Sequence, residues 1–451
     1  MSNQNSLEIF IENFKSYNND IALIYKNEEF TYSHLLERMA YWDNNLTVID
    51  KGSVVAIESD FTPETIAILF ALINIDAIVV PLDINHSNKN EKKIEIAELD
   101  FLIKVQSENA IEIIAQNNSL EKNQFYQGIQ HKNVPGLVLF TSGSSGDPKA
   151  ALHNFSKLLQ KFELKRTALR TVNFLLFDHW GGLNTLFHIL SNGGTVYILE
   201  ERTPDYVCSL IEKHQVELLP TSPTFLNMML FSRAHLKYNL SSLKIISYGA
   251  EPMPENLLNH LNKVFPTIKL QQTYGLIELG VMRSQSENNN SLWIKLGGSG
   301  FESRVVQNML QIKSESAMVG YLNAVSPFTE DGWFMTGYAV EVKGEYFKIL
   351  GRKSELINVG GEKVFPQEVE NLILEDENVI DVLVYGASNP LTGKIVCAKV
   401  KYKTSEPASE IIKRIKTQCR ARLQSFKVPV KIEIVEDSFE SARFKKSRFN
   451  G

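Results

Sequence analysis

The sequence predicts an α/β fold in which a large N-terminal lobe of mostly parallel sheets is followed by a barrel-like antiparallel part and a small C-terminal α/β lobe. From the start to about residue 300, short apolar runs rich in β-branched residues alternate with helix-like segments. This alternation is typical of βα units that build a parallel sheet. Residues 295–350 are rich in glycine and in strand-like runs, which favours hairpins. After Gly351 helix and strand patterns alternate again, which indicates a separate lobe.

Length and composition agree with a folded chain of more than one lobe. The chain has 451 residues, of which 43% are hydrophobic and 22% charged, close to the average of folded proteins. Because a single hydrophobic core stops growing near about 300 residues, at least two lobes are expected. We place the division so that the units are 1–351 and 352–451.

Charge and cysteine usage exclude several classes of function. The formal net charge of −5 gives too weak a field to favour nucleic acid or an anionic membrane surface. Cys208, Cys397 and Cys419 are far apart and have no metal-ligand spacing, so neither a disulfide framework nor a zinc site is predicted. The first ten residues have no basic flank before an apolar run, so no secretory signal is expected. These patterns together predict a cytoplasmic protein.

The longest apolar stretch, Thr65 to Leu82, is about long enough to be tested as a membrane span. Asn74, Asp76 and Pro81 interrupt it, and an aspartate in hydrocarbon is costly. We therefore predict a helix that ends near Asn74, followed by a short buried strand. The β-branched run of that strand is what a sheet covered on both faces demands.

The other expected elements follow in order along the chain. In the N-terminal lobe the strand-like runs are SVVAIES, DAIVVPL, GLVLFTSGS, GGTVYIL, VELLPTSP and LKIISYGA. Later, the run VEVKGEYFKIL predicts a hairpin with its turn at KGE. In the C-terminal lobe we expect a helix that opens at Pro366, a strand around 379–386, and a helix over 408–424 that ends before Pro429.

A loop rich in glycine and serine leaves the strand-like run that ends at Phe140. It reads Thr141-Ser-Gly-Ser-Ser-Gly-Asp-Pro-Lys149. Small residues let backbone N–H groups turn toward an anion, and Lys149 adds a positive charge for phosphate oxygens. A bare Ser/Gly turn is the alternative, but the added Thr, Pro and Lys favour a phosphate cradle. The loop is not that of a P-loop NTPase, because no hydroxyl residue follows the lysine.

Further motifs follow this loop, and together they resemble those of one superfamily. They are Tyr248–Pro252, Gln272–Glu278, Thr336-Gly337, Gly351-Arg352, Gly360–Pro366 and Lys445-Lys446. In this order they resemble the motifs of the ANL superfamily of adenylate-forming enzymes, which includes acyl-CoA and aryl-CoA synthetases, nonribosomal-peptide adenylation domains and luciferases. The resemblance covers about residues 136 to 448. It implies doubly wound sheets in an ATP- and acid-binding adenylation domain, 1–351, and a mobile lid domain, 352–451.

The resemblance also implies a role for each matched residue. The backbone after Tyr248 would lie against adenine, Tyr274 would stack on it, and Thr273 and Glu278 would contact the phosphates and Mg²⁺. The ATP-binding set implied in this way is Thr141, Ser142, Gly143, Ser144, Ser145, Gly146, Lys149, Gly249, Ala250, Glu251, Thr273, Tyr274, Gly275 and Arg352.

The lid is expected to carry the remaining functional groups. By resemblance, Lys446 bridges the reacting oxygens as the catalytic lysine. Lys445 stands where relatives usually have glycine, so either lysine is a candidate, and a merely solubilising basic tail is the alternative. Ser354 is at the expected hinge, and Gly360 and Gly361 form the face presented for thiol attack.

One residue departs from the superfamily pattern. After Thr336-Gly337, relatives have an aspartate that accepts hydrogen bonds from both ribose hydroxyls, whereas this sequence has Tyr338. A phenol is neutral at pH 7 and cannot accept two strong hydrogen bonds as a carboxylate can. Weakened ATP binding is therefore one hypothesis for this chain.

The stretch Phe177 to Asn184 bears on the choice of acid. It resembles the His-x-Gly-Gly-Leu pattern of acyl-CoA and aryl-CoA synthetases, with His179 as the gate residue that faces the acid. Asp178 is the alternative, since amino-acid-activating relatives hold the substrate ammonium with an aspartate in this region. The spacing to Gly193 favours His179 and hence a non-amino carboxylic acid. His179 as an ordinary structural histidine is the third possibility.

Three hypotheses of function follow. The leading one is an AMP-forming acid–thiol ligase that uses ATP and Mg²⁺, makes acyl-AMP and pyrophosphate, and transfers the acyl group to CoA or to the phosphopantetheine of a carrier protein. The second is an adenylation enzyme that loads a carrier protein or forms an amide. The third is a catalytically weakened acid- or nucleotide-binding homologue. The sequence leaves open the identity of the acid and the oligomeric state.

Overall fold

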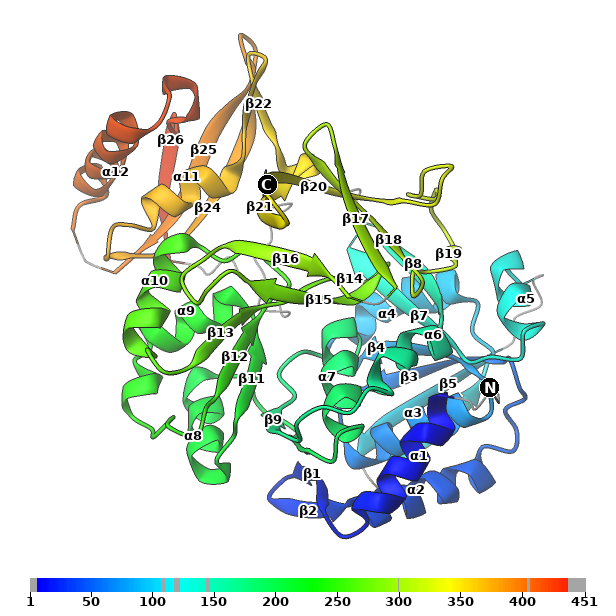
Figure 1. Cartoon of the computed structure of the whole chain (residues 1–451). Helices are drawn as coiled ribbons and strands as arrows, with labels where there is room; N and C mark the ends of the chain where they lie inside the picture. The colour runs from blue at the N-terminus through cyan, green and yellow to red at the C-terminus, as the bar shows by residue number, and fades with distance from the viewer. Residues whose placement is uncertain are drawn as a thin grey trace.

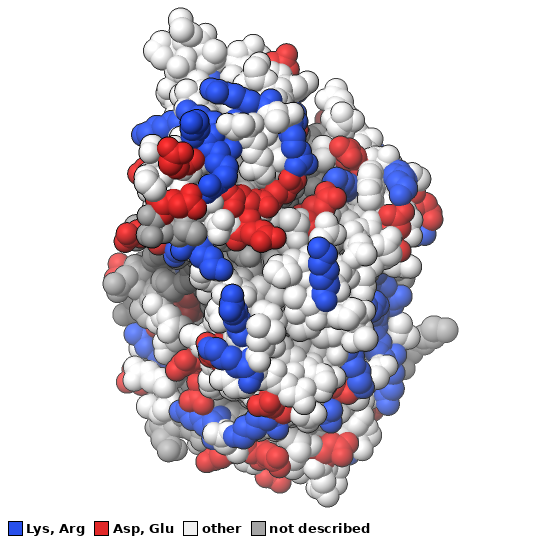
Figure 2. Space-filling model, turned by 90° about the vertical axis from the view of Figure 1, so that its left-hand side faces the viewer, with Lys and Arg blue, Asp and Glu red and all other residues white. Residues whose placement is uncertain are grey.

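The computed structural model describes residues 6–107, 110–116, 122–142, 147–298, 300–403 and 406–436. Figure 1 shows a large part, blue to yellow, that contains the chain up to about residue 350, and a smaller part, gold to red, at the upper left. Figure 2 shows that, on one face of the molecule, basic and acidic side chains occur in small groups over both parts. The predicted α/β fold class is confirmed.

The first sheet of the large lobe is built around parallel strands. Its strands are β3 (Val54–Ser59), β4 (Ile78–Asp83), β5 (Phe101–Ser107), β6 (Ala110–Ala115), β7 (Gly136–Ser142), β8 (Pro148–Asn154) and β19 (Gly320–Tyr321). The order is β19-β8-β7-β4-β3-β5-β6; β3 runs parallel to β4 and β5, and β4 to β7, while the outer strands are antiparallel to their neighbours. Every residue of β3 and β4 is buried, as expected for strands covered on both faces.

The second sheet of the large lobe is parallel except at one edge. Its strands are β1 (Ile21–Tyr25), β2 (Glu28–Thr31), β9 (Arg170–Val172), β10 (Thr195–Tyr197), β11 (Leu218–Thr221), β12 (Ile245–Tyr248) and β13 (Lys269–Gln272). They are ordered β13-β12-β11-β9-β10-β1-β2, with only β2 antiparallel. Thr221, Tyr248 and Gln272 are in register, so β11, β12 and β13 end at the same edge.

The helices of the large lobe begin where the sequence supplies caps. They are α1 (Ser6–Tyr17), α2 (Tyr32–Asn45), α3 (Pro63–Asn74), α4 (Ser87–Ala97), α5 (Gln124–Gln130), α6 (Phe155–Leu159), α7 (Trp180–Leu190), α8 (Pro204–His214), α9 (Pro223–Phe231) and α10 (Glu255–Val264). Three of them, α3, α8 and α9, begin with proline after a capping Thr62, Thr203 or Ser222. A hydroxyl cap accepts a first-turn N–H, and proline has no N–H to leave unpaired.

The long apolar stretch folds as predicted. The helix α3 ends at Asn74, Asp76 adopts a left-handed conformation with φ 55°, and β4 follows from Ile78. Among the described residues no helix has the length and apolarity needed to cross a membrane.

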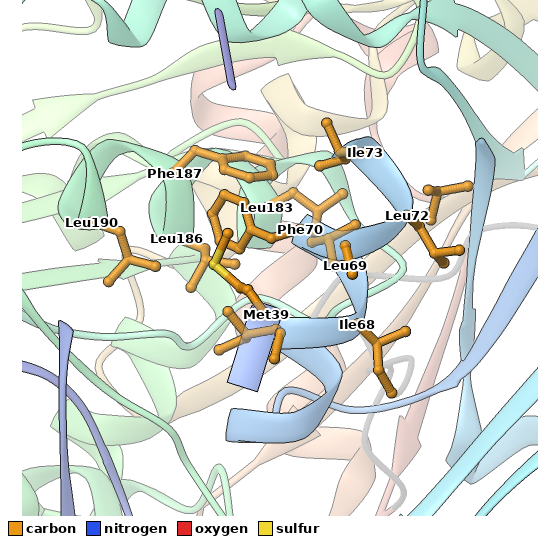
Figure 3. Close-up of a cluster of buried hydrophobic side chains, with 14 of the residues drawn as sticks. Met39, Ile68, Leu69, Phe70, Leu72, Ile73, Leu183, Leu186, Phe187 and Leu190 are labelled. Atoms are coloured by element: carbon orange, nitrogen blue, oxygen red, sulfur yellow. The ribbon is translucent and has the colours of Figure 1, made fainter. Parts of the chain in front are cut away.

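The main hydrophobic core lies where α3 packs against α7. Figure 3 shows Phe70 of α3 among side chains of α7, with Met39 of α2 beside them. The rings of Phe70 and Phe187 meet edge to face, with their centroids 5.6 Å apart. The helix α3 connects β3 to β4 of the first sheet, and α7 precedes β10 of the second. This core therefore joins the two sheets and holds their edges in place relative to each other.

A third, antiparallel sheet corresponds to the predicted barrel-like part. Its strands, in spatial order, are β14 (Tyr274–Leu276), β15 (Gly280–Ser286), β16 (Trp293–Gly297), β21 (Tyr346–Arg352), β20 (Phe334–Lys343), β18 (Met309–Ser314) and β17 (Phe301–Val306). The predicted hairpin is formed by β20 and β21, in which Lys343 is opposite Tyr346 and Gly344 has φ 60°.

The C-terminal part has a sheet and a core of its own. It contains β22 (Ile357–Val359), β23 (Glu362–Val364), α11 (Pro366–Ile373), β24 (Val379–Asn389), β25 (Gly393–Tyr402), α12 (Ala408–Arg422) and β26 (Lys431–Val435). The helix predicted to open at Pro366 does so, and the predicted strand lies within β24. The buried core of this part is made of residues between Ile357 and Ile432. The exact division at residue 351 stays a prediction.

The C-terminal part rests on two helices of the large lobe. The amide of Asn227 in α9 donates to the carbonyl of Ile380 at 2.9 Å. The amide of Asn256 in α10 donates to the carbonyl of Leu374 at 2.5 Å. These are neutral hydrogen bonds, each contributing only about 1 kcal/mol net.

Candidate active site

The predicted site residues gather where parallel strands of the two large sheets end. The glycine-rich loop follows the C-terminal end of β7, and the segments after β12 and β13 begin at Gly249 and Thr273. The segment with His179 follows β9 and opens α7. In open α/β sheets ligands bind outside the carboxyl ends of the strands, so the fold directs these motifs to one region.

The glycine-rich loop connects two antiparallel strands. Thr141 of β7 is opposite Lys149 of β8, and the backbone of Ser142 is opposite Pro148. Gly143, Ser144, Ser145 and Gly146 lie outside the described residues. The ammonium of Lys149 is 5.7 Å from the centroid of the Tyr321 ring, at a distance typical of cation–π contact.

The strand ends after β12 and β13 approach each other so closely that only glycine fits. A Cβ atom at Gly249 would lie 2.4 Å from Thr273 Oγ1 and 2.9 Å from the Thr273 carbonyl oxygen. Thr273 in turn donates through its backbone N–H and its hydroxyl to the Tyr248 carbonyl, at 2.7 and 3.0 Å. The predicted adenine-facing backbone and the predicted phosphate contact are therefore directly adjacent.

The two residues after Gly249 shape the same strand end. Ala250 has φ 69°, the left-handed region that L-residues seldom adopt, which marks a sharp change in chain direction. Glu251 accepts a hydrogen bond from the Thr224 N–H in the first turn of α9, with Oε1 at 2.7 Å. The carboxylate of Glu251 thus caps a helix, while its backbone stays at the predicted nucleotide site.

Glu278 lies in the turn between β14 and β15. Its Oε1 accepts a hydrogen bond from the Tyr321 hydroxyl at 2.5 Å. Burial, followed by the nearby Glu278 carboxylate, raises the pKa of Tyr321 far above its usual value, so the phenol is a neutral donor. Tyr321 therefore has Lys149 on its ring face and Glu278 at its hydroxyl. It links the lysine that follows the loop to the predicted metal-binding carboxylate.

Tyr274 and Gly275 belong to β14, which begins directly after Thr273. A Cβ at Gly275 would lie 3.0 Å from Val281 Cγ2, so the β14–β15 hairpin is tightly closed here. The buried Tyr274 ring meets Tyr338 edge to face, with centroids 6.0 Å apart. Burial, then the neighbouring Tyr338, raises the pKa of Tyr274, so both phenols are neutral at physiological pH.

Tyr338, which replaces the usual aspartate, is engaged by Arg352. The two residues are opposite each other in β20 and β21. Arg352 Nε donates to the Tyr338 hydroxyl at 2.8 Å, and the guanidinium lies 4.9 Å from the ring centroid. Burial raises the pKa of Tyr338, and the guanidinium only partly offsets this effect. Arg352 thus contacts a neutral phenol and not a carboxylate at this position.

His179 is the N-cap of α7. Its Nδ1 accepts a hydrogen bond from the Gly181 N–H at 3.0 Å, which leaves the proton of the neutral ring on Nε2. The next residue, Trp180, is buried, with its Nε1 close to Gly280 at the start of β15. Asp178 is also buried, at 3% exposure, and pairs with Lys93 of α4. His179 is therefore oriented by the helix that it caps.

The groups predicted in the lid lie partly within the described residues. Ser354 lies in an exposed 3₁₀ turn, Lys353–Glu355, directly after β21. Gly360 and Gly361 form the exposed turn between β22 and β23, where Gly360 N–H donates to the Thr392 carbonyl of the same lobe at 2.9 Å. Lys445 and Lys446 lie outside the described residues.

The residues present fit a magnesium–nucleotide complex. Among the described residues no three His, Cys, Asp or Glu side chains form a self-sufficient metal site. Mg²⁺ commonly takes only one or two carboxylates and completes its shell with water and substrate phosphates. The Glu278 carboxylate, near Lys149 by way of Tyr321, matches that kind of donor set.

Two residues of the site were missed by sequence reasoning. Tyr321 is brought in because β19 pairs with β8, about 170 residues upstream, and no local motif marks it. Lys93 lies in α4, a helix that connects two strands of the first large sheet, whereas Asp178 follows a strand of the second. For Tyr321, the available sequence signal was the short apolar segment Val319-Gly320-Tyr321. Such a segment by itself predicts a strand in the core and not a residue of the site.

Two family models match the chain. Residues 10–301 match the AMP-binding enzyme model, and residues 368–446 match the model of the C-terminal domain of AMP-binding enzymes.

Curated relatives and solved structures agree with the family match. A peroxisomal trans-cinnamate:CoA ligase of Petunia hybrida is 24% identical, covering 94% of this chain and 89% of that protein. A 2-succinylbenzoate–CoA ligase of Bacillus pumilus is 24% identical over 95% and 94%. An indoleacetate–CoA ligase of Aromatoleum aromaticum is 29% identical over 59% and 57%.

Solved structures share the fold over nearly the whole chain. The anthranilate CoA ligase AuaEII in complex with anthranoyl-AMP has a TM-score of 0.82 at 18% identity, covering 99% of this chain and 96% of that one. The amide bond synthetase McbA from Marinactinospora thermotolerans has a TM-score of 0.79 at 19% identity, with 96% of each chain covered. With these matches over the lobe that carries the site, the predicted resemblance is confirmed: the chain belongs to the AMP-binding enzyme family, within the ANL superfamily of adenylate-forming enzymes.

Proposed function

We propose that this protein activates a non-amino carboxylic acid as acyl-AMP, releases pyrophosphate, and transfers the acyl group to the thiol of CoA. One observation carries the proposal. In this AMP-binding enzyme, Tyr321 contacts Lys149 through its ring and Glu278 through its hydroxyl, close to the ends of the strands. Relatives named as CoA ligases support the predicted AMP-forming acid–thiol ligase.

The reaction needs charge neutralisation more than acid–base catalysis. An oxygen of the ionised acid attacks the α-phosphorus of ATP, and the bond to pyrophosphate breaks in line. Because both reactants are anions and the acid is already deprotonated, positive charge and positioning lower the barrier. Lys149 supplies a cation near the phosphates, and a magnesium ion held with Glu278 would neutralise phosphate charge. The predicted residues include no Ser-His-Asp triad and no pair of carboxylates, which agrees with this chemistry.

The gate histidine supports recognition of the acid. With Nδ1 accepting from Gly181, His179 Nε2 is the donor, and we expect it to face the substrate carboxylate. The three relatives described above are named for cinnamate, indoleacetate and 2-succinylbenzoate, which all carry an aromatic ring. We therefore favour an acid with an aryl group, while a fatty acyl chain is the alternative from the sequence.

A second candidate acceptor is an amine or a carrier protein. It is favoured by the structural likeness to an amide bond synthetase. CoA and a phosphopantetheine arm deliver the same thiol, so the acceptor is decided by assay. Location in the cytoplasm stays a sequence prediction.

Pyrophosphate exchange tests the proposed function. We expect ATP/pyrophosphate exchange that depends on one of a panel of aryl, fatty and amino acids, and then CoA-dependent thioester formation with the best acid. Activity with a holo-carrier protein, whose phosphopantetheine thiol is free, and none with CoA would favour the second acceptor. Acid binding without any exchange would leave the weakened homologue as the function.

Tyr338 offers a test of that last alternative. Tyr338→Asp is expected to tighten ATP binding about tenfold, because a carboxylate makes stronger, charge-assisted hydrogen bonds to ribose hydroxyls. The measurement is ATP affinity by calorimetry. Tyr338→Phe is the control, since it removes the contact with Arg352 without adding charge. An unchanged affinity in Tyr338→Asp would show that the missing aspartate does not limit nucleotide binding.

A further inference from the structure

A buried ion pair involves Asp178, the residue that precedes the gate histidine in the sequence. Lys93 Nζ of α4 is 3.5 Å from Asp178 Oδ2, and the two side chains are only 12% and 3% exposed. The ammonium of Lys93 is also 5.8 Å from the centroid of the Phe140 ring, in the strand that enters the glycine-rich loop. The pair thus lies between the phosphate-binding strand and the N-terminus of α7.

Its lysine is held by a well-anchored helix. Asn90, three residues earlier in α4, donates to Glu58 Oε1 at 2.8 Å and to the Asp83 carbonyl at 2.9 Å, at the ends of β3 and β4. Its neighbour Lys92 points outward instead, where it pairs with Asp147 at 2.5 Å and is 54% exposed. Of these two lysines, therefore, only Lys93 is directed into the protein.

The charge of Asp178 matters because the next residue, His179, is expected to bind an anion. On the proposed function, on which this inference rests, His179 receives an anionic carboxylate. A buried carboxylate one residue away would repel that anion and attract a cationic group, because charges interact strongly where water is excluded. An amino acid carries such a cation, its α-ammonium, next to the carboxylate that is to be activated.

We propose that Lys93 determines the substrate class by neutralising Asp178, so that the pocket accepts carboxylic acids without an ammonium group and rejects α-amino acids. Lys93 occupies the place beside Asp178 that a substrate ammonium would otherwise take. Lys93 and Asp178 are thus specificity-determining residues that act through charge, and neither takes part in bond making or breaking.

The experiment compares acids with their α-amino counterparts in four proteins. The probes are 3-phenylpropanoate and indole-3-propanoate, phenylalanine and tryptophan, and the best acid from the exchange screen. The proteins are the wild type, Lys93→Met, Asp178→Asn and the double variant. Lys237→Met is the matched control, because it breaks an exposed ion pair, with Asp205, that is distant in sequence from Lys93. Pyrophosphate exchange gives KM and kcat for each probe, and thermal unfolding reports whether each variant is folded.

We expect Lys93→Met to raise KM for the best acid about tenfold, with a much smaller change in kcat, since an unpaired buried charge disfavours the bound anion. The same variant should gain measurable exchange with phenylalanine or tryptophan. The double variant should regain the acid KM and lose the amino-acid exchange, because both charges are gone. Asp178→Asn should not gain amino-acid exchange, and Lys237→Met should match the wild type.

The outcomes separate this inference from the proposed function. A folded Lys93→Met with an unchanged acid KM would overturn the inference, as would a double variant as impaired as Lys93→Met, which is the pattern of a purely structural pair. A wild type that uses amino acids as readily as acids would overturn the inference and leave acid activation intact. A wild type without exchange on any acid would instead refute the proposed function.

Discussion

Replacing Glu278 by glutamine is expected to lower acid-dependent pyrophosphate exchange by about 100-fold or more, the usual cost of removing one preorganised electrostatic group. The substitution keeps the size of the side chain and an oxygen that can accept from Tyr321, so the loss reports charge. We expect the acid KM to change little and the Mg²⁺ concentration for half-maximal exchange to rise. The measurement is exchange as a function of Mg²⁺ at saturating ATP.

Tyr321→Phe is the graded control for that experiment. It removes the 2.5 Å hydrogen bond to Glu278 but keeps the ring beneath Lys149. Losing a hydrogen bond to a charged group costs about tenfold, so this variant should lie between the wild type and Glu278→Gln. Wild-type exchange in a folded Glu278→Gln would show that the carboxylate is not the metal-binding group.

Lys446→Ala is expected to lower exchange by about 1000-fold, because a cation that bridges two reacting anions acts mainly in the transition state. By the family resemblance, the same lysine is not needed for attack by the thiol. Thioester formation from separately prepared acyl-AMP and CoA should therefore continue in this variant. Measuring the two half-reactions separately distinguishes a catalytic loss from a failure to fold.

Lys445→Ala is the matched variant for this prediction, since it removes one positive charge from the neighbouring position. Exchange that survives in Lys446→Ala but fails in Lys445→Ala would assign the role to Lys445. Full exchange in both single variants would mean that these lysines form only a basic tail.

The fold was predictable wherever one local pattern dominates. In Thr65–Leu82 the positions of Asn74 and Asp76 already separate a helix from a strand, and the structure has α3 and β4 there. The turn at Gly344 likewise marks a hairpin, because glycine tolerates the positive φ that the turn requires. Such signals are contained within a few residues.

The site was only partly predictable, because its parts are joined by tertiary contacts. The motif residues identified the family, yet Tyr321 and Glu278 are 43 positions apart, and Lys93 and Asp178 are 85 apart. No periodicity or short motif encodes such pairs, since they depend on which strands become neighbours. The roles given to Lys446, Ser354 and the Gly360–Gly361 turn stay predictions, as do the nucleotide contacts of the glycine-rich loop.

The packing of α3 against α7 has a consequence during synthesis on the ribosome. Eleven of the residues of α3 are buried in the finished protein, but α7 follows roughly a hundred residues later. At about 5–20 residues per second, this apolar helix waits about 5–20 s for its packing partner. We therefore expect nascent chains arrested before residue 180 to bind hold-type chaperones and to aggregate when released, whereas chains that extend past α7 do so less.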